Sequence, residues 1–401
     1  MKPRVTGPLF AFLPIRLKSG REKLSGLYRF AAEHGREIKV FDGITTAREL
    51  RTLIASWHPS GCLVEASFLG PDLSVADFSG VPTVFQGLDP KREGKGLFLV
   101  QQDPAAVASL AAEELFALGY RDCAYIGTPE RYFWDTARRD VFARAAKSAK
   151  RRFHEFGFAG RGLESEENLA KLRAFLRNLP KPCAVMAAAD YVAATALSVC
   201  KGLGLSVPGE LAFVGVDDDE LVCENTRPKL TSVHPDFEQG GYLAAALLDE
   251  RLAHPKLRPV VRSFGPDGIT RRGSTARHYA DTRVNAALAF IRERCCEDIG
   301  VPEVAAAMKC GRRFAERHFR EATGQSVLES IRAERLERVF RLLRNPRQDL
   351  GSIPSLCGYS SSAYLKTYFK RVTGLTMGTW RKQAKGAAPS VSAGRIHHGR
   401  H

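Results

Sequence analysis

The chain has 401 residues, which is enough for two or three domains that each bury their own core. Its 60 Lys and Arg outnumber its 44 Asp and Glu, and the formal net charge of +16 predicts a polyanionic partner such as nucleic acid. No apolar run approaches the length of a membrane span, and the nine cysteines show no metal-ligand spacing. We therefore expect a reduced, cytoplasmic protein with no metal, no cofactor and no membrane partner.

From the N-terminus, the first part of the chain alternates apolar strands with amphipathic helices. The run PLFAFLPI, residues 8–15, is too short for an export signal and predicts a first buried strand. Further strands are predicted at GCLVEAS, CAYIG, AVMAAA and LAFVGVD, which are residues 61–67, 123–127, 184–189 and 211–217. Helices are predicted at residues 20–35, 103–119 and 190–204. This alternation is typical of parallel α/β sheets.

Several of these segments resemble the ligand-binding core of the LacI/GalR regulators. The similarity includes the helix GREKLSGLYRFAAEHG, the segment AAEELFALGYRDCAYIG and, most specifically, VPGELAFVGVDDDELVCENTRPKLTSV at residues 207–233. The resemblance covers nearly all of residues 1–275. It implies an α/β fold of the periplasmic-binding-protein type, in which two lobes with parallel sheets enclose a sugar-binding cleft.

Four residues are candidate ligand contacts on the strength of this resemblance. Asp217 matches a carboxylate that accepts from sugar hydroxyls, and Arg138 matches an arginine that donates a forked pair of hydrogen bonds. Trp134, four residues before Arg138 on the same helical face, is the candidate stacking platform. Asp190 follows Ala189, where the family often has Asn, so either Asp190 takes over the polar contact or the ligand lacks that group. Each has a structural alternative: the aspartates as helix caps, Arg138 in a surface ion pair, and Trp134 in the core.

The last quarter of the chain carries most of the excess positive charge. Residues 283–385 hold 20 Lys and Arg against 10 Asp and Glu, which is +10 of the total. Within this part, VPEVAAAMKCG at residues 301–311 predicts a short helix followed by a turn. RRFAERHFREATG at residues 312–324 then predicts a second helix that ends at a glycine. The apolar face expected for the second helix contains Phe314, Ala315 and Phe319.

A long helix, predicted over residues 326–346, joins this unit to another of the same kind at residues 350–374. In the second unit, Ser361 can cap a helix. The apolar side expected for that helix contains Tyr364, Leu365, Tyr368 and Phe369.

The two units resemble the DNA-binding domain of the AraC/XylS family, which has two tandem helix-turn-helices. The hallmarks are the helix ERLERVFRLL, the block CGYSSSAYLKTYFKRVTG and the TWR that follows it. The resemblance implies that the second helix of each unit enters a major groove, with the two grooves about 34 Å apart on one face of the DNA.

Side chains on the polar faces of these two helices are the candidate DNA contacts. The predicted base contacts are Arg312, Arg313, Glu316 and Arg317 in the first unit and Ser362, Lys366 and Thr367 in the second. The predicted phosphate contacts are Arg320, Lys370 and Arg371. The alternative for any one of the arginines is that it contacts phosphate instead of a base.

Four positions depart from the AraC/XylS pattern. Gly311 replaces a serine N-cap, which weakens the cap by only a few tenths of a kcal/mol. Ala315 replaces a leucine, which underfills the core by roughly 2–3 kcal/mol unless Phe314 compensates. Pro354 is tolerable only if its helix begins near residue 352, and Met377 replaces a proline.

The order of a LacI-type core and an AraC-type DNA-binding domain is similar to that of the xylose-responsive XylR family. We expect a ligand-binding domain at residues 1–275, a linker at 276–282, an all-α double helix-turn-helix domain at 283–385 and a disordered tail at 386–401. The resemblance implies a sugar-responsive transcription regulator that binds double-stranded DNA, an activator of carbohydrate catabolism genes with a xylose-like pentose as effector. Lobe closure around the sugar would shift the arrangement of a homodimer on its half-sites, and RNA polymerase is the expected further partner.

Rival classes have less support in the sequence. There is no phosphate-binding glycine loop, no G-x-S-x-G elbow and no metal cluster, so we expect no enzyme and no catalytic residue. An extracytoplasmic sugar-binding protein would not need the basic C-terminal part. The open alternative is a DNA-binding regulator that responds to a non-sugar ligand, or to a protein partner, through a cleft that no longer binds sugar.

Overall fold

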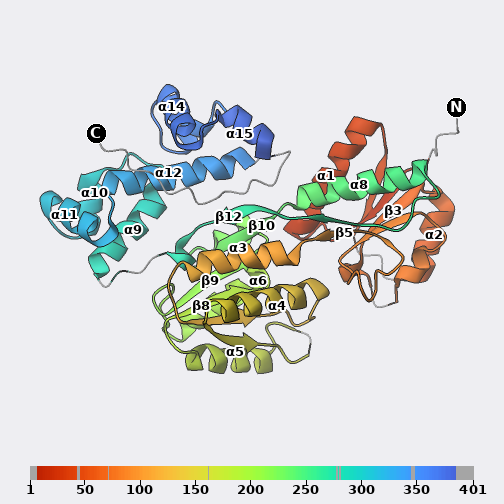
Figure 1. The fold of residues 1–401 in the computed structure, drawn as a ribbon, viewed down its shortest axis with the longest axis horizontal. Coiled ribbons are helices and arrows are strands. Elements are labelled where there is room, and N and C mark those ends of the chain that lie inside the picture. The colour runs from red at the N-terminus through yellow and green to blue at the C-terminus, as the bar shows by residue number, and fades with distance from the viewer. Residues whose placement is uncertain are drawn as a thin grey trace.

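The chain forms two α/β lobes followed by an all-helical domain (Figure 1). The predicted fold class is confirmed, because both lobes contain sheets of mainly parallel strands and the C-terminal part is helical. The tail predicted to be disordered lies outside the described residues, and the predicted domain boundaries remain predictions. The structure, a computed structural model, describes residues 7–42, 46–70, 72–160, 162–276, 279, 281–344 and 348–384.

The first lobe is built on a six-stranded parallel sheet in the order β11-β5-β4-β3-β1-β2. Side chains alternate along β1, so Leu9 and Ala11 pack under α1 and α8 while Phe10 and Phe12 pack on the side of α2. The predicted strand 61–67 is shorter than expected, since β3 gives way to a 3-10 turn, η1 (Ala66–Phe68). The elements of this lobe are β1 (Leu9–Phe12), α1 (Lys18–His34), β2 (Ile38–Phe41), α2 (Ala47–Trp57), β3 (Gly61–Glu65), η2 (Val75–Phe78), β4 (Thr83–Gln86), β5 (Phe98–Gln102), α8 (Phe237–Ala253) and β11 (Val261–Phe264).

Two glycines bring α1 and α8 into backbone contact. A Cβ at Gly26 would lie 1.9 Å from the Glu238 carbonyl oxygen, and a Cβ at Gly241 would lie 2.0 Å from the Lys23 carbonyl oxygen. Neither position has room for a side chain. The path of α1 across the lobe is therefore set by this crossing.

The second lobe has a six-stranded sheet in the order β12-β10-β9-β8-β6-β7, parallel except for the β10–β12 pair. Helices α3 and α4 pack on one face around Val107 and Phe142, and α5 and α6 pack on the other around Leu172 and Val192. The elements of this lobe are α3 (Pro104–Phe116), β6 (Asp122–Ile126), α4 (Phe133–Ser148), β7 (Arg152–Phe156), α5 (Glu166–Asn178), β8 (Cys183–Ala187), α6 (Asp190–Gly202), β9 (Leu211–Val216), α7 (Glu220–Cys223), β10 (Thr231–Pro235), β12 (Pro266–Thr270) and η3 (Gly273–Thr275).

Three connections in the described chain cross between the lobes: β5 to α3, β10 to α8, and β11 to β12. They run side by side, because the Asp103 amide donates to the Phe264 carbonyl at 2.8 Å and the Asp236 amide donates to the Gly265 carbonyl at 3.1 Å. We call these three connections the hinge.

The helical domain contains two small cores that one long helix connects. The first core is built around Val304, Ala315 and Phe319, and the second around Leu365 and Phe369. α12 contributes buried side chains to both cores, which fixes one helix-turn-helix unit relative to the other. Pro354 lies in the first turn of a short helix after Ser352, the placement that the sequence requires. The helices are α9 (Thr282–Arg294), α10 (Val301–Ala307), α11 (Arg312–Thr323), α12 (Val327–Arg344), α13 (Ile353–Leu356), α14 (Ser362–Thr373) and α15 (Met377–Ala384).

Candidate functional site

A cavity of about 440 Å³ lies between the two lobes, within the size range of small-molecule sites. We call it the cleft. Its lining comes from both lobes and includes the candidate ligand contacts of the sequence analysis, which are Trp134, Arg138, Asp190 and Asp217. The structure thus brings these four residues together in one place.

Asp217 presents its carboxylate to the cleft from an unusual backbone conformation. Its φ is 109° and that of Asp218 is 50°, in the region that favours glycine. Its amide donates to the Val233 carbonyl at 2.9 Å, while its carboxylate accepts no hydrogen bond from the described residues. Burial raises the pKa of Asp217 to about 6, against the opposing charges of Arg138 and Lys18. A partly buried carboxylate that accepts no hydrogen bond from the described residues is a strong acceptor for a ligand hydroxyl.

Arg138 is 3% exposed, so the predicted alternative of a surface ion pair does not describe it. Its Nη1 donates to the Ala188 carbonyl at 2.6 Å and its Nη2 donates to the Gln102 side chain. Its Nε is buried without a partner among the described residues. Each Nη carries a second N–H, so the guanidinium retains donors for a ligand.

Trp134 belongs to a row of stacked side chains at the cleft. The Arg138 guanidinium lies 4.5 Å from its ring centroid, and the Tyr132 ring stacks on it at 5.2 Å. Tyr132 in turn lies 5.9 Å from Phe68, which belongs to η1 of the first lobe. The aromatic lining of the cleft is therefore wider than the one tryptophan that the sequence singles out.

Asp190 is 2% exposed and already has protein partners. Its carboxylate accepts from the Ser232 hydroxyl at 2.6 Å and from the Asp219 amide at 2.7 Å, and the Cys223 thiol lies 3.3 Å away. Burial and the neighbouring charge of Asp217 raise the pKa of Asp190 well above its usual range. Asp190 holds the loop after β9 in place as well as lining the cleft.

The first-lobe wall was not predicted. Lys23 and Glu65 form a buried ion pair there, and the Gln101 side-chain nitrogen is buried without a partner among the described residues. Lys18 donates to the Asp218 carbonyl at 2.6 Å and so connects the lobes. In the sequence, Lys18 and Lys23 fit the polar, solvent-exposed face of an amphipathic helix, so they were not predicted to line the cleft. The polar pair that ends the apolar run FLVQQ was the available signal for Gln101.

The predicted reading helices, α11 and α14, expose all ten candidate DNA contacts. These residues are Arg312, Arg313, Glu316, Arg317, Arg320, Ser362, Lys366, Thr367, Lys370 and Arg371. Gly324 and Gly374 end the two helices with φ of 74° and 75°. The Ser361 hydroxyl accepts from the Tyr364 amide at 3.2 Å, which confirms the predicted cap.

The predictions that Tyr364 and Phe314 face the cores of their units are wrong. Tyr364 is 44% exposed and stacks on Tyr368, because only Leu365 and Phe369 point into the second core. Phe314 is half-buried and stacks on His318 at a centroid distance of 5.1 Å, at the edge of the first core. Both rings therefore lie beside the basic surface of their helix.

Within the described residues, no group of three His, Cys, Asp or Glu side chains is arranged to hold a metal ion. Their helices also include none with the length and apolar character of a membrane span. The nine cysteines are free thiols.

Comparison with known proteins places both parts of the chain. Residues 112–275 match the periplasmic binding protein-like domain, and residues 304–383 match a helix-turn-helix domain. The xylose operon regulatory protein of Escherichia coli K12 is 31% identical over 291 residues, which span 70% of this chain and 73% of the relative. The protein of the same name from Haemophilus influenzae is 28% identical over 68% of this chain and 71% of its own length.

Solved structures agree with these matches. A xylose-binding transcription activator, xylR, superposes with a TM-score of 0.63 at 26% identity, covering 95% of this chain and 99% of that one. The transcriptional regulator CelR in complex with cellobiose has a TM-score of 0.56 at 23% identity over 68% of this chain and 86% of its own, which is a likeness of fold.

Proposed function

Because the chain belongs to the family of the xylose operon regulatory proteins, a family of DNA-binding transcription regulators, we propose that its effector is D-xylose or a related pentose. The effector binds in the cleft, and the regulator activates genes for the use of that sugar. The observation that carries the proposal is the Asp217 carboxylate, which lines the cleft without a hydrogen bond from the described chain.

The lining of the cleft suits a small polyhydroxylated ring. Asp217 accepts hydrogen bonds from hydroxyls, and Arg138 and Gln101 have donors without partners among the described residues. Phe68 and Tyr132 offer apolar surface to a sugar face. Because these groups come from different lobes, a bound sugar favours the closed arrangement of the hinge.

The two reading helices act on the DNA as one unit, since α12 belongs to both of their cores. Their arginines donate bidentate hydrogen bonds to guanine, Glu316 accepts from cytosine, and the remaining cations contact phosphates. We further propose that the protein works as a homodimer on two half-sites and recruits RNA polymerase.

Titration calorimetry of the full chain against pentoses and hexoses tests the effector. We expect heat with D-xylose or a related pentose, loss of that heat in Asp217→Ala, and retention in Asp140→Asn. Asp140 is the matched control because it lies on the outer side of α4, paired with Arg139, away from the cleft.

An absence of heat with every sugar would favour the other candidate, a regulator with a non-sugar ligand or a protein partner. Ala189 supports that candidate, because it lines the cleft without a polar side chain where the resembling family often has Asn. Duplexes selected by the full chain from a random pool test the DNA side. Equal affinity for selected and random duplexes would contradict sequence-specific regulation.

A further inference from the structure

The one-turn helix α7 touches the cleft and the DNA-binding domain within a few residues. Asp219, which caps α7, and Val222 both line the cleft. Glu224 directly follows α7, and its Oε1 lies 3.3 Å from Nη1 of Arg341 on α12. This ion pair joins the DNA-binding domain to the second lobe.

The loop that leads into α7 also contacts the first lobe. Lys18, from the first lobe, donates to the Asp218 carbonyl of the second lobe at 2.6 Å. The Asp218 amide donates to the Ser232 hydroxyl at 3.0 Å, and that hydroxyl donates to Asp190 in the cleft wall. Closure of the lobes and occupancy of the cleft therefore both act on Asp218.

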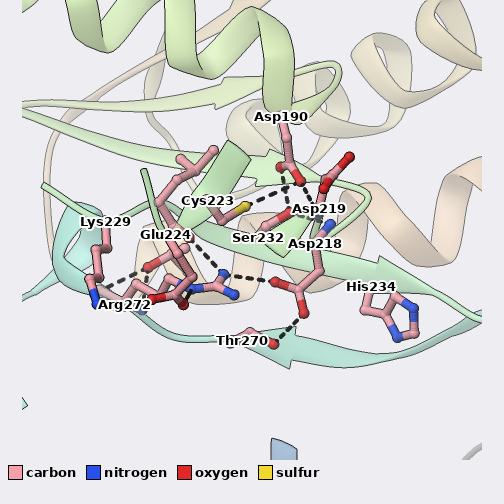
Figure 2. A network of polar contacts seen from close by, with 12 residues as sticks. Asp190, Asp218, Asp219, Cys223, Glu224, Lys229, Ser232, His234, Thr270 and Arg272 are labelled. Atoms are coloured by element: carbon pink, nitrogen blue, oxygen red, sulfur yellow. Dashed lines mark hydrogen bonds and ion pairs between the residues drawn. The ribbon is translucent and has the colours of Figure 1, made fainter. Parts of the chain in front are cut away.

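From Asp218, buried polar contacts lead to Glu224 (Figure 2). Nη1 of Arg272 donates to the Asp218 carboxylate at 2.7 Å, and Nε of the same guanidinium donates to Glu224 at 2.7 Å. The Arg272 side chain is 2% exposed, so a shift of Asp218 cannot be absorbed by free rotation of the guanidinium. Thr270 and Lys229 hold the two carboxylates from their other sides.

Glu224 remains an anion throughout the physiological range. Burial alone would raise its pKa, but hydrogen bonds from Lys229 and Arg272 lower the pKa of Glu224 to about 2. Its interaction with Arg341 therefore depends on position and not on protonation. The partners are 32% and 25% exposed at their side chains, which is a pair that a small displacement can make or break.

We propose that the Glu224–Arg341 ion pair is the contact through which closure of the cleft sets the orientation of the DNA-binding domain, with Asp218 and Arg272 as the connecting residues. The proposal rests on the proposed function for its trigger, a sugar in the cleft. Arg341 and Glu224 act as positioning residues, since they touch neither the effector nor the bases.

The test compares Arg341→Gln with Arg338→Gln in the full chain. Arg338 is the matched control, because it lies three residues away on α12 and makes no ion pair with the second lobe in the described structure. D-xylose affinity is measured by calorimetry, and affinity for a selected duplex is measured with and without D-xylose.

We expect Arg341→Gln to bind D-xylose within about twofold of the wild type, since it lies outside the cleft. The effect of D-xylose on DNA affinity should fall by about threefold or more, while Arg338→Gln keeps it. Arg341→Lys, which retains the charge, should restore part of the effect. A full D-xylose effect in Arg341→Gln would overturn the proposal.

A second measurement needs no sugar. Hydrogen exchange at residues 217–224 is compared in the free full-length variants, where Arg341→Gln should exchange faster than Arg338→Gln. If the wild type gives no heat with D-xylose or any related pentose, or binds DNA with the same affinity in the presence and absence of the sugar, the proposed function fails and this measurement decides. Equal exchange in the two variants would then refute the connection itself.

Discussion

Two adjacent aspartates at the end of β9 have positive φ, and each such residue costs on the order of 1–3 kcal/mol. The conformation points the Asp217 carboxylate into the cleft and brings the Asp218 carbonyl to Lys18. A regular continuation of the strand would place neither group there. The strain is thus located where the two lobes and the ligand site meet.

Replacement of Asp217 by asparagine should weaken sugar binding and increase the free energy of unfolding at neutral pH. The raised pKa of Asp217 means that the folded state holds its proton more tightly than the unfolded state, so stability falls as pH rises from about 4 to about 6. Asp217→Asn lacks this loss and also removes the charge that acts on Asp190. At pH 7 the variant should be more stable than the wild type by on the order of 1 kcal/mol.

Urea unfolding of the sugar-free proteins at pH 4 and pH 7 measures this difference, which should shrink at pH 4. Asp140→Asn should show no such gain. A variant less stable than the wild type at pH 7 would mean that Asp217 has a protein partner in solution.

At the scale of the elements, the two reading helices begin differently. α14 has a side-chain cap from Ser361, whereas α11 begins at Gly311 without one. A side chain at Gly311 would meet no atom within 4 Å, and its φ of −70° suits any residue. The first reading helix therefore has an unfilled capping position, and the second does not.

Reciprocal substitutions test these caps. Ser361→Ala should destabilise the second unit by about 1 kcal/mol, and Gly311→Ser should stabilise the first by a few tenths of a kcal/mol. Thermal unfolding of the full chain measures the overall change in stability. Hydrogen exchange in α11 and α14 then shows which of the two units is affected. Destabilisation by Gly311→Ser would show that the backbone there differs in solution.

At the scale of the whole molecule, charged groups bridge the lobes beside the hinge. His234, at the end of β10, contacts Asp267 on β12 at 2.7 Å and Glu22 on α1 at 3.0 Å. Burial alone would lower the pKa of His234, but the two carboxylates raise it well above its usual range. The imidazolium thus connects the first lobe to the second at neutral pH.

His234→Gln should therefore weaken the lobe contact in a pH-dependent way. A raised histidine pKa contributes stability that is complete below about pH 6.5 and is lost as pH rises through the folded-state value. The variant should be less stable than the wild type by roughly 2 kcal/mol at pH 6, because the partly buried carboxylates of Asp267 and Glu22 lose the imidazolium as a partner. The gap should close in alkaline solution, and thermal unfolding across pH measures it. A gap that is constant with pH would indicate a neutral His234.

The elements and the second-lobe site were predictable because local patterns encode them. The polar residue that ends a buried strand such as LAFVGVD predicts a side chain at the edge of a cleft. Helical spacing of apolar residues predicts the burial of Phe319 and Leu365. Lys23 was missed because its burial depends on Glu65, from a different element. Arg341 and Glu224 are 117 residues apart, and no local pattern signals that contact.

The glycine crossing of α1 and α8 limits which substitutions the protein can accept in evolution while it keeps its cleft. Lys18 and Lys23 reach the cleft only because α1 lies flush against its neighbour. A single added methyl at Gly26 or Gly241 would wedge the helices apart and tilt both ammonium groups out of place. Substitution of Gly26 or Gly241 during evolution should therefore abolish the response to sugar, as the loss of a ligand-contacting side chain would.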